Sequence, residues 1–345
     1  MQVFISYYVR RWRRVAPVGP DRFLSPLRVL LSARNEAQTL PETLPTLLRQ
    51  RLSVRVVAGD DGSTDETRAI LAVFLAGPPH EVHSIPQAYH ERFPGKQAVL
   101  AYLEERVEPP YFGVVDADMW LPESWAETLV GALEADSRLG AVSGPSLPRA
   151  EGLWSGFQRV EWAATLYLIA AEQMRGNPPP TAIGNSLWVR YEAWQAIGGW
   201  KNLLPTLVED YHFMQALLAK GWQFAWVFAP EAYAETRAEK TLKSWWHQRL
   251  RWRKAIQSVP LLAKFYWGIQ VIVPWAVLSS GWWSLGLWIV AEVLPLWRLR
   301  TALSVRGVLR YVPLLLVYRF FQGIVMGFLA LGQRKLVWRE RWYVE

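Results

Sequence analysis

The chain has 345 residues, a formal net charge of +8, 51% hydrophobic residues, 21 tryptophans and no cysteine. The lack of cysteine excludes disulfides, thiolate metal sites and cysteine nucleophiles, so any metal must be held by oxygen or histidine ligands. The length allows one large domain plus a further segment, and the tryptophan content indicates a boundary between water and membrane.

The basic residues flank apolar segments, at 10–14, 243–254 and 298–310. This distribution is typical of the cytoplasmic face of a membrane, and no zinc-finger, helix-turn-helix or RNA-recognition signature accompanies it. We therefore expect no nucleic acid partner and a location at the inner, cytoplasmic membrane, with the folded domain on the cytoplasmic side. Residues 1–26 are predicted to be a basic segment on the membrane surface, with an amphipathic helix at 2–15 and no export signal.

From Arg28 to Gly144, short β-branched runs alternate with helical stretches, the order that builds a mostly parallel α/β sheet. Strands are predicted at 28–32, 54–58, 111–115 and 141–143, with a weaker one at 83–85. Helices are predicted at 40–50, 96–106 and 123–135, and Ser63-Thr64-Asp65-Glu66 is interpreted as a capping box that opens a helix running to about Ala76. Ligands are expected beyond the carboxyl ends of the strands.

The second half changes character along the chain. A helix, a proline-containing loop, a strand at 187–189 and a helix at 210–220 are predicted within 153–221. The range 265–291 has no charged residue and exceeds the ~20 residues that one crossing needs, so 265–297 is predicted to form a hairpin of two short crossings or a re-entrant pair. A third apolar segment, 311–331, contains Arg319, which is costly in lipid unless it faces protein or water. The alternative for both segments is a buried core hairpin.

The predicted strand at 111–115 is followed directly by Asp116-Ala117-Asp118. Two carboxylates at this spacing can share a divalent cation, Mg²⁺ or Mn²⁺, which in turn bridges the diphosphate of a nucleotide. The alternative is that Asp-x-Asp is a solvated turn without a ligand, but its position directly after an apolar strand favours the metal site.

Two further acidic motifs have both a local and a chemical interpretation. Asp60 and Asp61 follow the second strand, where a carboxylate can accept a hydrogen bond from a nucleobase N–H; the alternative is a capped turn. Asp210, next to Glu209, is either the amino-terminal cap of its helix or the general base that takes a proton from an acceptor hydroxyl.

Residues 248–252 read Gln-Arg-Leu-Arg-Trp. An arginine can neutralise a leaving diphosphate, and an indole face can support a sugar ring. A basic helix beside a membrane would explain the arginines but not Gln248.

Taken together, these motifs resemble the inverting family 2 glycosyltransferases with the GT-A fold, and among them the membrane-bound branch of cellulose-, chitin- and hyaluronan-synthase-like enzymes. The motifs that carry the resemblance, within residues 27–254, are Ser32-Ala33-Arg34-Asn35-Glu36, Asp60-Asp61-Gly62-Ser63-Thr64-Asp65, Gly95-Lys96, Asp116-Ala117-Asp118, Gly184-Asn185, Gly198-Gly199-Trp200, Glu209-Asp210 and Gln248-Arg249-Leu250-Arg251-Trp252. A GT-A domain over 27–257, followed by a membrane domain with transmembrane helices over 258–345, is the organisation that this resemblance implies.

The resemblance also implies an activity and roles. The expected enzyme moves a sugar from a nucleotide-sugar, a UDP-sugar in the first place, to a lipid-linked or membrane-embedded acceptor, with a divalent metal and inversion of configuration. The implied roles are nucleotide-sugar binding for Ala33, Glu36, Asp60, Asp61, Lys96, Asp116 and Arg251, metal binding for Asp118 and Asp116, acceptor binding for Asn185, Glu209, Gln248 and Trp252, and the catalytic base for Asp210.

Two departures from the family pattern concern the donor and acceptor. Ala33-Arg34 stands where many relatives have Pro and Tyr, and Val208 stands where Thr is common. The apolar part is too small to enclose a polymer channel, so a non-processive transfer is expected. A polyprenyl-phosphate sugar synthase and a non-catalytic membrane scaffold of polysaccharide assembly are the remaining alternatives.

Overall fold

The computed structural model describes residues 18–258, 272–273, 275–277, 279–303, 305, 307–331, 335–338 and 341–344. The predicted surface helix at 2–15 and residues 265–271, 274 and 278 of the predicted hairpin lie outside these residues. The chain forms two compact units, the first from Met1–Ser146 and Gln173–Thr236, the second from Leu147–Glu172 and Arg237–Glu345.

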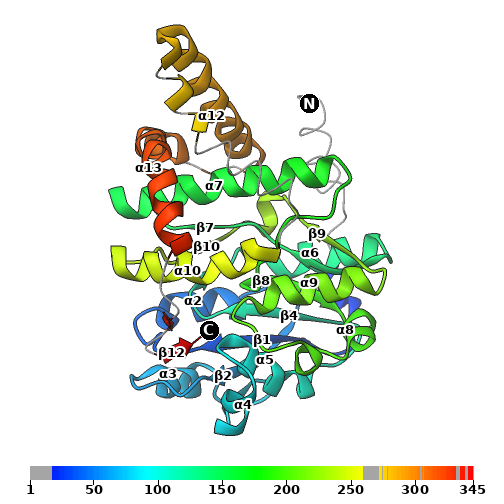
Figure 1. Cartoon of the computed structure of the whole chain (residues 1–345). Helices are drawn as coiled ribbons and strands as arrows, with labels where there is room; N and C mark the ends of the chain where they lie inside the picture. The colour runs from blue at the N-terminus through cyan, green and yellow to red at the C-terminus, as the bar shows by residue number, and fades with distance from the viewer. Residues whose placement is uncertain are drawn as a thin grey trace. The chain divides into compact units, whose positions relative to one another are not determined.

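The first unit is built on a seven-stranded sheet with the order β3-β2-β1-β4-β8-β6-β9 (Figure 1). Neighbouring strands are parallel except where β8 meets β4 and β6. The strands are β1 (Leu27–Ala33), β2 (Val54–Asp60), β3 (Glu81–Ser84), β4 (Tyr111–Asp116), β6 (Leu139–Ser143), β8 (Ser186–Arg190) and β9 (Gln223–Trp226). The predicted α/β class with a mostly parallel sheet is therefore confirmed.

Three short strands form a second, smaller sheet with the order β5-β10-β7. β5 (Met119–Trp120) pairs antiparallel with β10 (Ala234–Thr236). β7 (Ser146–Pro148) lies where the chain passes from the first unit to the second.

Helices cover both faces of the large sheet, because alternate residues of each strand point to opposite sides. Val29 and Leu31 of β1 belong to the same core cluster as residues of α2 (Leu40–Leu48), α3 (Thr67–Phe74) and α6 (Trp125–Ala135). On the other face, Phe112 of β4 meets the rings of Trp194 and Trp200 edge-on. The helices of that side are α5 (Lys96–Leu103), α8 (Tyr191–Ile197) and α9 (Glu209–Ala219), and the short α4 (Gln87–Arg92) precedes α5.

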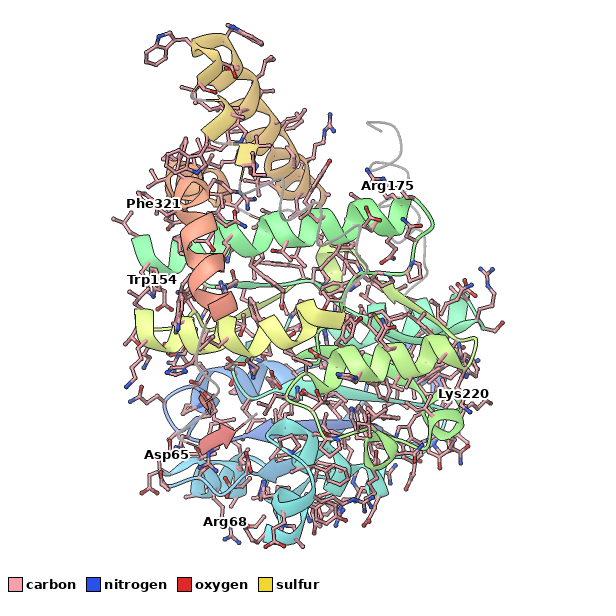
Figure 2. All side chains as sticks on the ribbon, viewed as in Figure 1. Asp65, Arg68, Trp154, Arg175, Lys220 and Phe321 are labelled. Atoms are coloured by element: carbon pink, nitrogen blue, oxygen red, sulfur yellow. The ribbon has the colours of Figure 1, made fainter. Side chains whose placement is uncertain are left out.

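One local prediction is wrong. Ser63 does not cap a helix, since α3 begins at Thr67 and its cap position is Glu66, without a side-chain cap. Asp65, labelled in Figure 2, accepts the Thr67 amide at 3.0 Å and the Ala37 amide at 3.1 Å. Ser63 instead binds the loop that follows β1, because its Oγ accepts a hydrogen bond from the Asn35 amide at 3.1 Å. The polar run therefore joins two loops before it starts a helix.

The second unit contains α7 (Leu153–Met174), α10 (Leu242–Ser258), α12 (Trp282–Leu303), α13 (Val312–Leu331) and an antiparallel pair, β11 (Lys335–Trp338) with β12 (Arg341–Val344). An aromatic cluster joins three of these helices: Phe157 of α7 lies 5.1 Å from Tyr318 of α13, and Trp245 of α10 lies 6.3 Å from the same ring, measured between centroids.

Within the described residues, we find no helix that combines the length and the apolar character required to cross a membrane. The apolar segment predicted at 311–331 coincides with α13. Its Arg319 pairs with Glu292 of α12 at 3.4 Å, with both side chains largely buried. The free-energy cost predicted for burying the charge of this arginine is thus offset by an ion pair within the unit.

Candidate active site

The acidic motifs gather at one edge of the large sheet. In the parallel register, Ala33 lies opposite Asp60 and Ser32 lies opposite Asp116. The carboxyl ends of β1, β2 and β4 therefore meet at the same edge, which is where ligands bind in sheets of this kind.

Asp61 is the most deeply buried of these carboxylates, with 1% of the residue exposed. Its amide donates to the carbonyl of Ala33 at 2.9 Å, and one carboxylate oxygen lies 3.0 Å from Nε2 of His90 on α4. Arg34 donates to the Asp61 carbonyl. His90 and Arg34 were not predicted as site residues; nothing in the local sequence around His90 indicates that a short helix brings it to the end of β2.

Asp60 has a structural partner of its own. Its Oδ1 accepts the Ser63 amide at 3.2 Å, and its carbonyl accepts the Ile85 amide at 3.1 Å. Glu36, also predicted to bind the nucleotide, is buried, and its amide donates to Thr67 Oγ1 at 2.7 Å. These two residues fix the loops around Asp61.

The Asp116-Ala117-Asp118 turn is held on both sides. The Ala117 amide donates to the carbonyl of Ser32 at 3.2 Å, and its carbonyl accepts the Thr43 hydroxyl at 2.6 Å. Directly after the turn, β5 pairs with β10, which places the Thr236 hydroxyl 3.3 Å from Oδ2 of Asp118. The sheet and the β5–β10 pair thus set the direction of both carboxylates.

Lys96, the first residue of α5, connects Asp116 at the end of β4 with the loop that contains Gly184. Its ammonium group forms an ion pair with Asp116 and donates to the carbonyl of Gly184 at 2.8 Å. Burial by itself lowers the pKa of Lys96, but the carboxylates of Asp116, Glu209 and Asp210 outweigh it and raise that pKa. Lys96 is therefore a fixed positive charge among three acidic side chains.

Asp210 lies on the other side of Gly184. Its Oδ2 accepts the Gly184 amide at 3.0 Å, and its Oδ1 accepts the Tyr211 amide at 2.8 Å. The alternative that Asp210 caps its helix is wrong, since α9 begins at Glu209 and the cap position is Val208. A Cβ added to Gly184 would lie 3.3 Å from both the Asp210 Cβ and the Lys96 Nζ, so this peptide sits tightly between the two side chains.

Asn185 follows in the same loop and has its Oδ1 3.4 Å from the Ser146 hydroxyl. Glu209 is buried and approaches Gly184 from α9, because its Oε1 would lie 3.6 Å from a Cβ added there. Two of the four residues predicted to bind the acceptor, Asn185 and Glu209, thus lie next to Gly184.

The motif at 248–252 belongs to α10 of the second unit. Gln248 donates to Glu239 at 3.1 Å, and Arg249 forms an ion pair with Glu161. The Arg249 guanidinium lies 4.3 Å from the centre of the Trp252 ring, which also packs against Trp162 at 5.2 Å. Trp252 is therefore part of an aromatic and cationic stack within this unit, and Arg251 is half-buried on the same helix.

The donor set at the turn fits a hard divalent cation. The described part of the chain brings together no group of three or more histidine, cysteine or carboxylate side chains suited to a metal. Two aspartates would supply the protein's share of the ligands, since Mg²⁺ is commonly held by one or two carboxylates while phosphates and water complete its shell. Asp118 and Asp116 would hold such an ion only together with a diphosphate.

This α/β sheet, with carboxylates at the ends of parallel strands, is consistent with the GT-A fold of nucleotide-sugar-dependent transferases. The chain matches the family described as "Glycosyl transferase family group 2" over residues 111–329. It belongs to this family, and it is a glycosyltransferase.

Two relatives illustrate the similarity. The probable glycosyltransferase YdaM of Bacillus subtilis (strain 168) is 26% identical over 256 residues, which are 70% of this chain and 58% of that protein. The chain thus spans less than two thirds of the length of this relative. The mannosyltransferase PcManGT from Pyrobaculum calidifontis, solved in complex with GDP-Man and Mn²⁺, is 19% identical and superposes with a TM-score of 0.55 over 92% of this chain and 95% of its own. That similarity concerns the fold.

Proposed function

We propose that this glycosyltransferase transfers a single sugar, with inversion, from a nucleotide-diphosphate-sugar to a hydroxyl of a lipid-linked acceptor at the inner membrane. The domain over 27–257 carries the transfer site, and the part from 258 onward associates with the membrane. A divalent metal assists the leaving diphosphate, and Asp210 is the base.

The observation that carries the proposal is the arrangement around Gly184. Its carbonyl accepts from Lys96, which pairs with Asp116, while its amide donates to Asp210. The carboxylate expected beside the diphosphate and the carboxylate expected to accept a proton are therefore held by one peptide. Displacement at the anomeric carbon needs these two functions close together, one on each side of the sugar.

On the donor side, Asp61 suits a nucleobase that presents a ring N–H, because an ionised carboxylate can only accept hydrogen bonds. Uracil and guanine have such a group, whereas adenine and cytosine present an acceptor at that ring position. We expect a UDP-sugar first and a GDP-sugar as the alternative. The complex of PcManGT with GDP-Man and Mn²⁺ supports testing both.

At the transfer step, a bound Mg²⁺ or Mn²⁺ would neutralise charge on the diphosphate. The chain's own part is to orient the reactants and move one proton. As the acceptor oxygen bonds to the anomeric carbon, the bond to the diphosphate breaks and the hydroxyl proton passes to Asp210. Attack opposite the leaving group gives an inverted product.

The membrane part of the proposal is supported by the surface of α12. Five of its large apolar side chains are exposed, with 48–89% of each residue accessible: Trp282, Trp283, Leu287, Val290 and Trp297. The ion pair between Glu292 and Arg319 is by contrast largely buried. Apolar side chains on the outside of α12, with the Glu292 charge paired inside, match a lipid environment better than water.

The deciding experiment screens UDP- and GDP-sugars with the purified full-length chain, Mn²⁺ and a membrane lipid extract, and follows radiolabel into the lipid phase. Calorimetry with UDP, GDP and Mn²⁺ tests the binding part by itself. Asp118→Asn should abolish metal-dependent binding of the nucleoside diphosphate, since Asp116 alone cannot hold the ion. Equal affinity in the wild type and Asp118→Asn would refute the metal assignment.

A flotation assay tests the membrane part. The chain should float with vesicles of anionic lipid, and replacing Trp282, Trp283 and Leu287 with serine should reduce the floating fraction. A full-length chain that stays out of the lipid layer, monomeric and without bound lipid, would overturn this part while leaving the transfer chemistry intact.

A further inference from the structure

Helix α5 and the turn that directly follows it carry two buried polar side chains that the transfer chemistry described so far does not use. Gln97 is 0% exposed, and Glu104, directly after the helix in the turn 104–106, is 3% exposed. They are seven positions apart, close to two helical turns, so they lie on one face. Both face the loop 198–206, which leads from α8 to α9.

Gln97 satisfies the polar backbone groups of this loop. Its Oε1 accepts the Thr206 amide at 2.8 Å, and its Nε2 lies 3.2 Å from the carbonyl of Trp200 and 3.4 Å and 3.3 Å from those of Leu203 and Leu204. An amide is suited to this task because it donates and accepts at once. Loop backbone at this position would otherwise leave these groups without partners, which would destabilise this arrangement of the loop.

Glu104 holds the other end of the loop. Its carboxylate accepts the amides of Trp200 at 2.6 Å and Lys201 at 3.1 Å, and the indole N–H of Trp194 at 3.2 Å. Gly199 has φ +71°, and a Cβ there would lie 2.4 Å from Glu104 Oε2. Glycine at this position is what allows the carboxylate to reach the backbone.

The loop in turn fixes the start of α9. The Thr206 hydroxyl accepts the amide of Val208, the residue before the helix, at 3.2 Å. The Trp200 ring stacks on Phe213 of α9 with centroids 4.6 Å apart and planes 13° apart. A shift of the loop would therefore shift the helix that carries Asp210.

The same helix α5 begins with Lys96, which contacts Asp116 and the Gly184 carbonyl. α5 and the turn after it thus contact both sides of the proposed reaction. Lys96 contacts the carboxylate on the donor side, and Gln97 and Glu104 contact the loop before the helix that carries the base. We propose that Gln97 and Glu104 are positioning residues for the transfer step, which set the place of Asp210 relative to the donor by holding the loop 198–206.

This inference rests on the proposed role of Asp210. It also predicts a dependence on Asp210 that a purely stabilising role of the two residues would not produce. Misplacing a catalytic group by about 1 Å can cost ~10²-fold in rate. A residue that acts only by placing Asp210 should matter when Asp210 is present, and should matter little once that carboxylate has been removed.

The test is a double-mutant cycle with Gln97→Glu and Asp210→Asn in the full chain. A carboxylate at 97 can still accept the Thr206 amide but repels the three carbonyls that the amide group faced. We expect Gln97→Glu alone to lower kcat about 10–100-fold with less than about a threefold change in donor KM and in nucleotide affinity. In the Asp210→Asn background, followed by radiolabel over long incubations, the further loss should be less than about twofold.

Gln195→Glu, the same change on an exposed residue of α8, is the matched control and should leave turnover unchanged. Glu104→Gln is the second variant, should Gln97→Glu yield no folded protein. Its amide group would face three N–H donors, and kcat should fall again without a matching loss of donor affinity.

The outcomes separate the hypotheses. Equal losses in both backgrounds, a parallel loss of nucleotide affinity, or no loss in either variant would overturn the positioning role. Near-normal turnover in Asp210→Asn alone would overturn the proposed base, and the inference that depends on it would fall with it.

Discussion

The two ends of strand β4 carry polar clusters of opposite kinds. At the amino end, the Tyr111 hydroxyl donates to Glu134 at 2.6 Å and accepts from Arg190 at 3.1 Å, while Arg22 pairs with Glu134 at 3.0 Å. This cluster thus holds two guanidinium groups and one carboxylate. Arg190 also donates to the carbonyls of Leu133 and Leu139.

At the carboxyl end the balance is reversed, since the ammonium group of Lys96 lies among the carboxylates of Asp116, Glu209 and Asp210. Crowded like charges destabilise a fold unless a ligand of opposite charge relieves them. The amino end thus holds α6 against the sheet, and the carboxyl end carries the excess of negative charge that the proposed cation and proton would meet. Charge balance, more than burial, distinguishes the two.

The largest expected effect at the carboxyl end comes from Asp210→Asn. Asparagine keeps one oxygen for the amide bonds but cannot take the acceptor proton, so transfer should fall by ~10²–10⁴-fold while donor binding survives. Turnover is measured with the donor and acceptor found in the screen, and the anomeric configuration of the product by NMR. A product that retains the donor configuration, or turnover close to the wild type, would move the base elsewhere, to Glu209 first.

Gly184→Ala should have the next largest effect. A methyl group 3.3 Å from both Asp210 and Lys96 forces small shifts of the two side chains, and turnover should fall about tenfold or more. Gly19→Ala is the control, because a Cβ there meets nothing within 4 Å. Similar rates for the two alanine variants would mean that the peptide at 184 does not join the two sides of the reaction.

A smaller effect is expected from Thr236→Val, which removes the hydroxyl 3.3 Å from Asp118 and nearly keeps the shape. The lost hydrogen bond is worth ~1 kcal/mol, so affinity for the nucleoside diphosphate with Mn²⁺ should fall about fivefold. Calorimetry with and without the metal measures it. A loss of the same size without metal would show that Thr236 acts through the fold and not through Asp118.

The sequence predicted the parts of this site that depend on local pattern. The apolar strands before Asp60 and Asp116 are recognisable from their neighbours alone, because buried parallel strands are continuous β-branched runs. The place of these aspartates at one sheet edge then follows from the parallel order.

Contacts between distant segments were beyond that pattern. Gln97 meets Thr206, 109 positions further along, and Glu104 meets Trp200, 96 positions further along. From the local sequence Asp210 could be a helix cap. Its actual partner is the amide of Gly184, 26 positions earlier, which the local sequence does not reveal. The antiparallel β8 was predicted as a strand, but its pairing inside the sheet depends on β4 and β6 and not on its own residues.

The smallest effect belongs to the amino end of β4, and it concerns stability alone. Burial, together with the hydrogen bond to Glu134, raises the pKa of Tyr111 to about 12 from an ordinary value of 10.0. A folded chain that holds this proton more tightly than the unfolded chain is stabilised fully below pH 10, and loses that stabilisation as the pH rises through about 12. Tyr111→Phe lacks this proton and therefore this contribution to the slope.

The free energy of unfolding, from urea titrations between pH 9 and pH 12, should thus fall more steeply for the wild type than for Tyr111→Phe. After allowance for solvent screening, we expect the two curves to converge by about 1–2 kcal/mol over this range. Turnover of Tyr111→Phe at neutral pH should equal that of the wild type, because no group of this cluster faces the carboxyl end of the sheet. Parallel stability curves, or a loss of turnover comparable to that of Gly184→Ala, would erase the distinction between the two ends of β4.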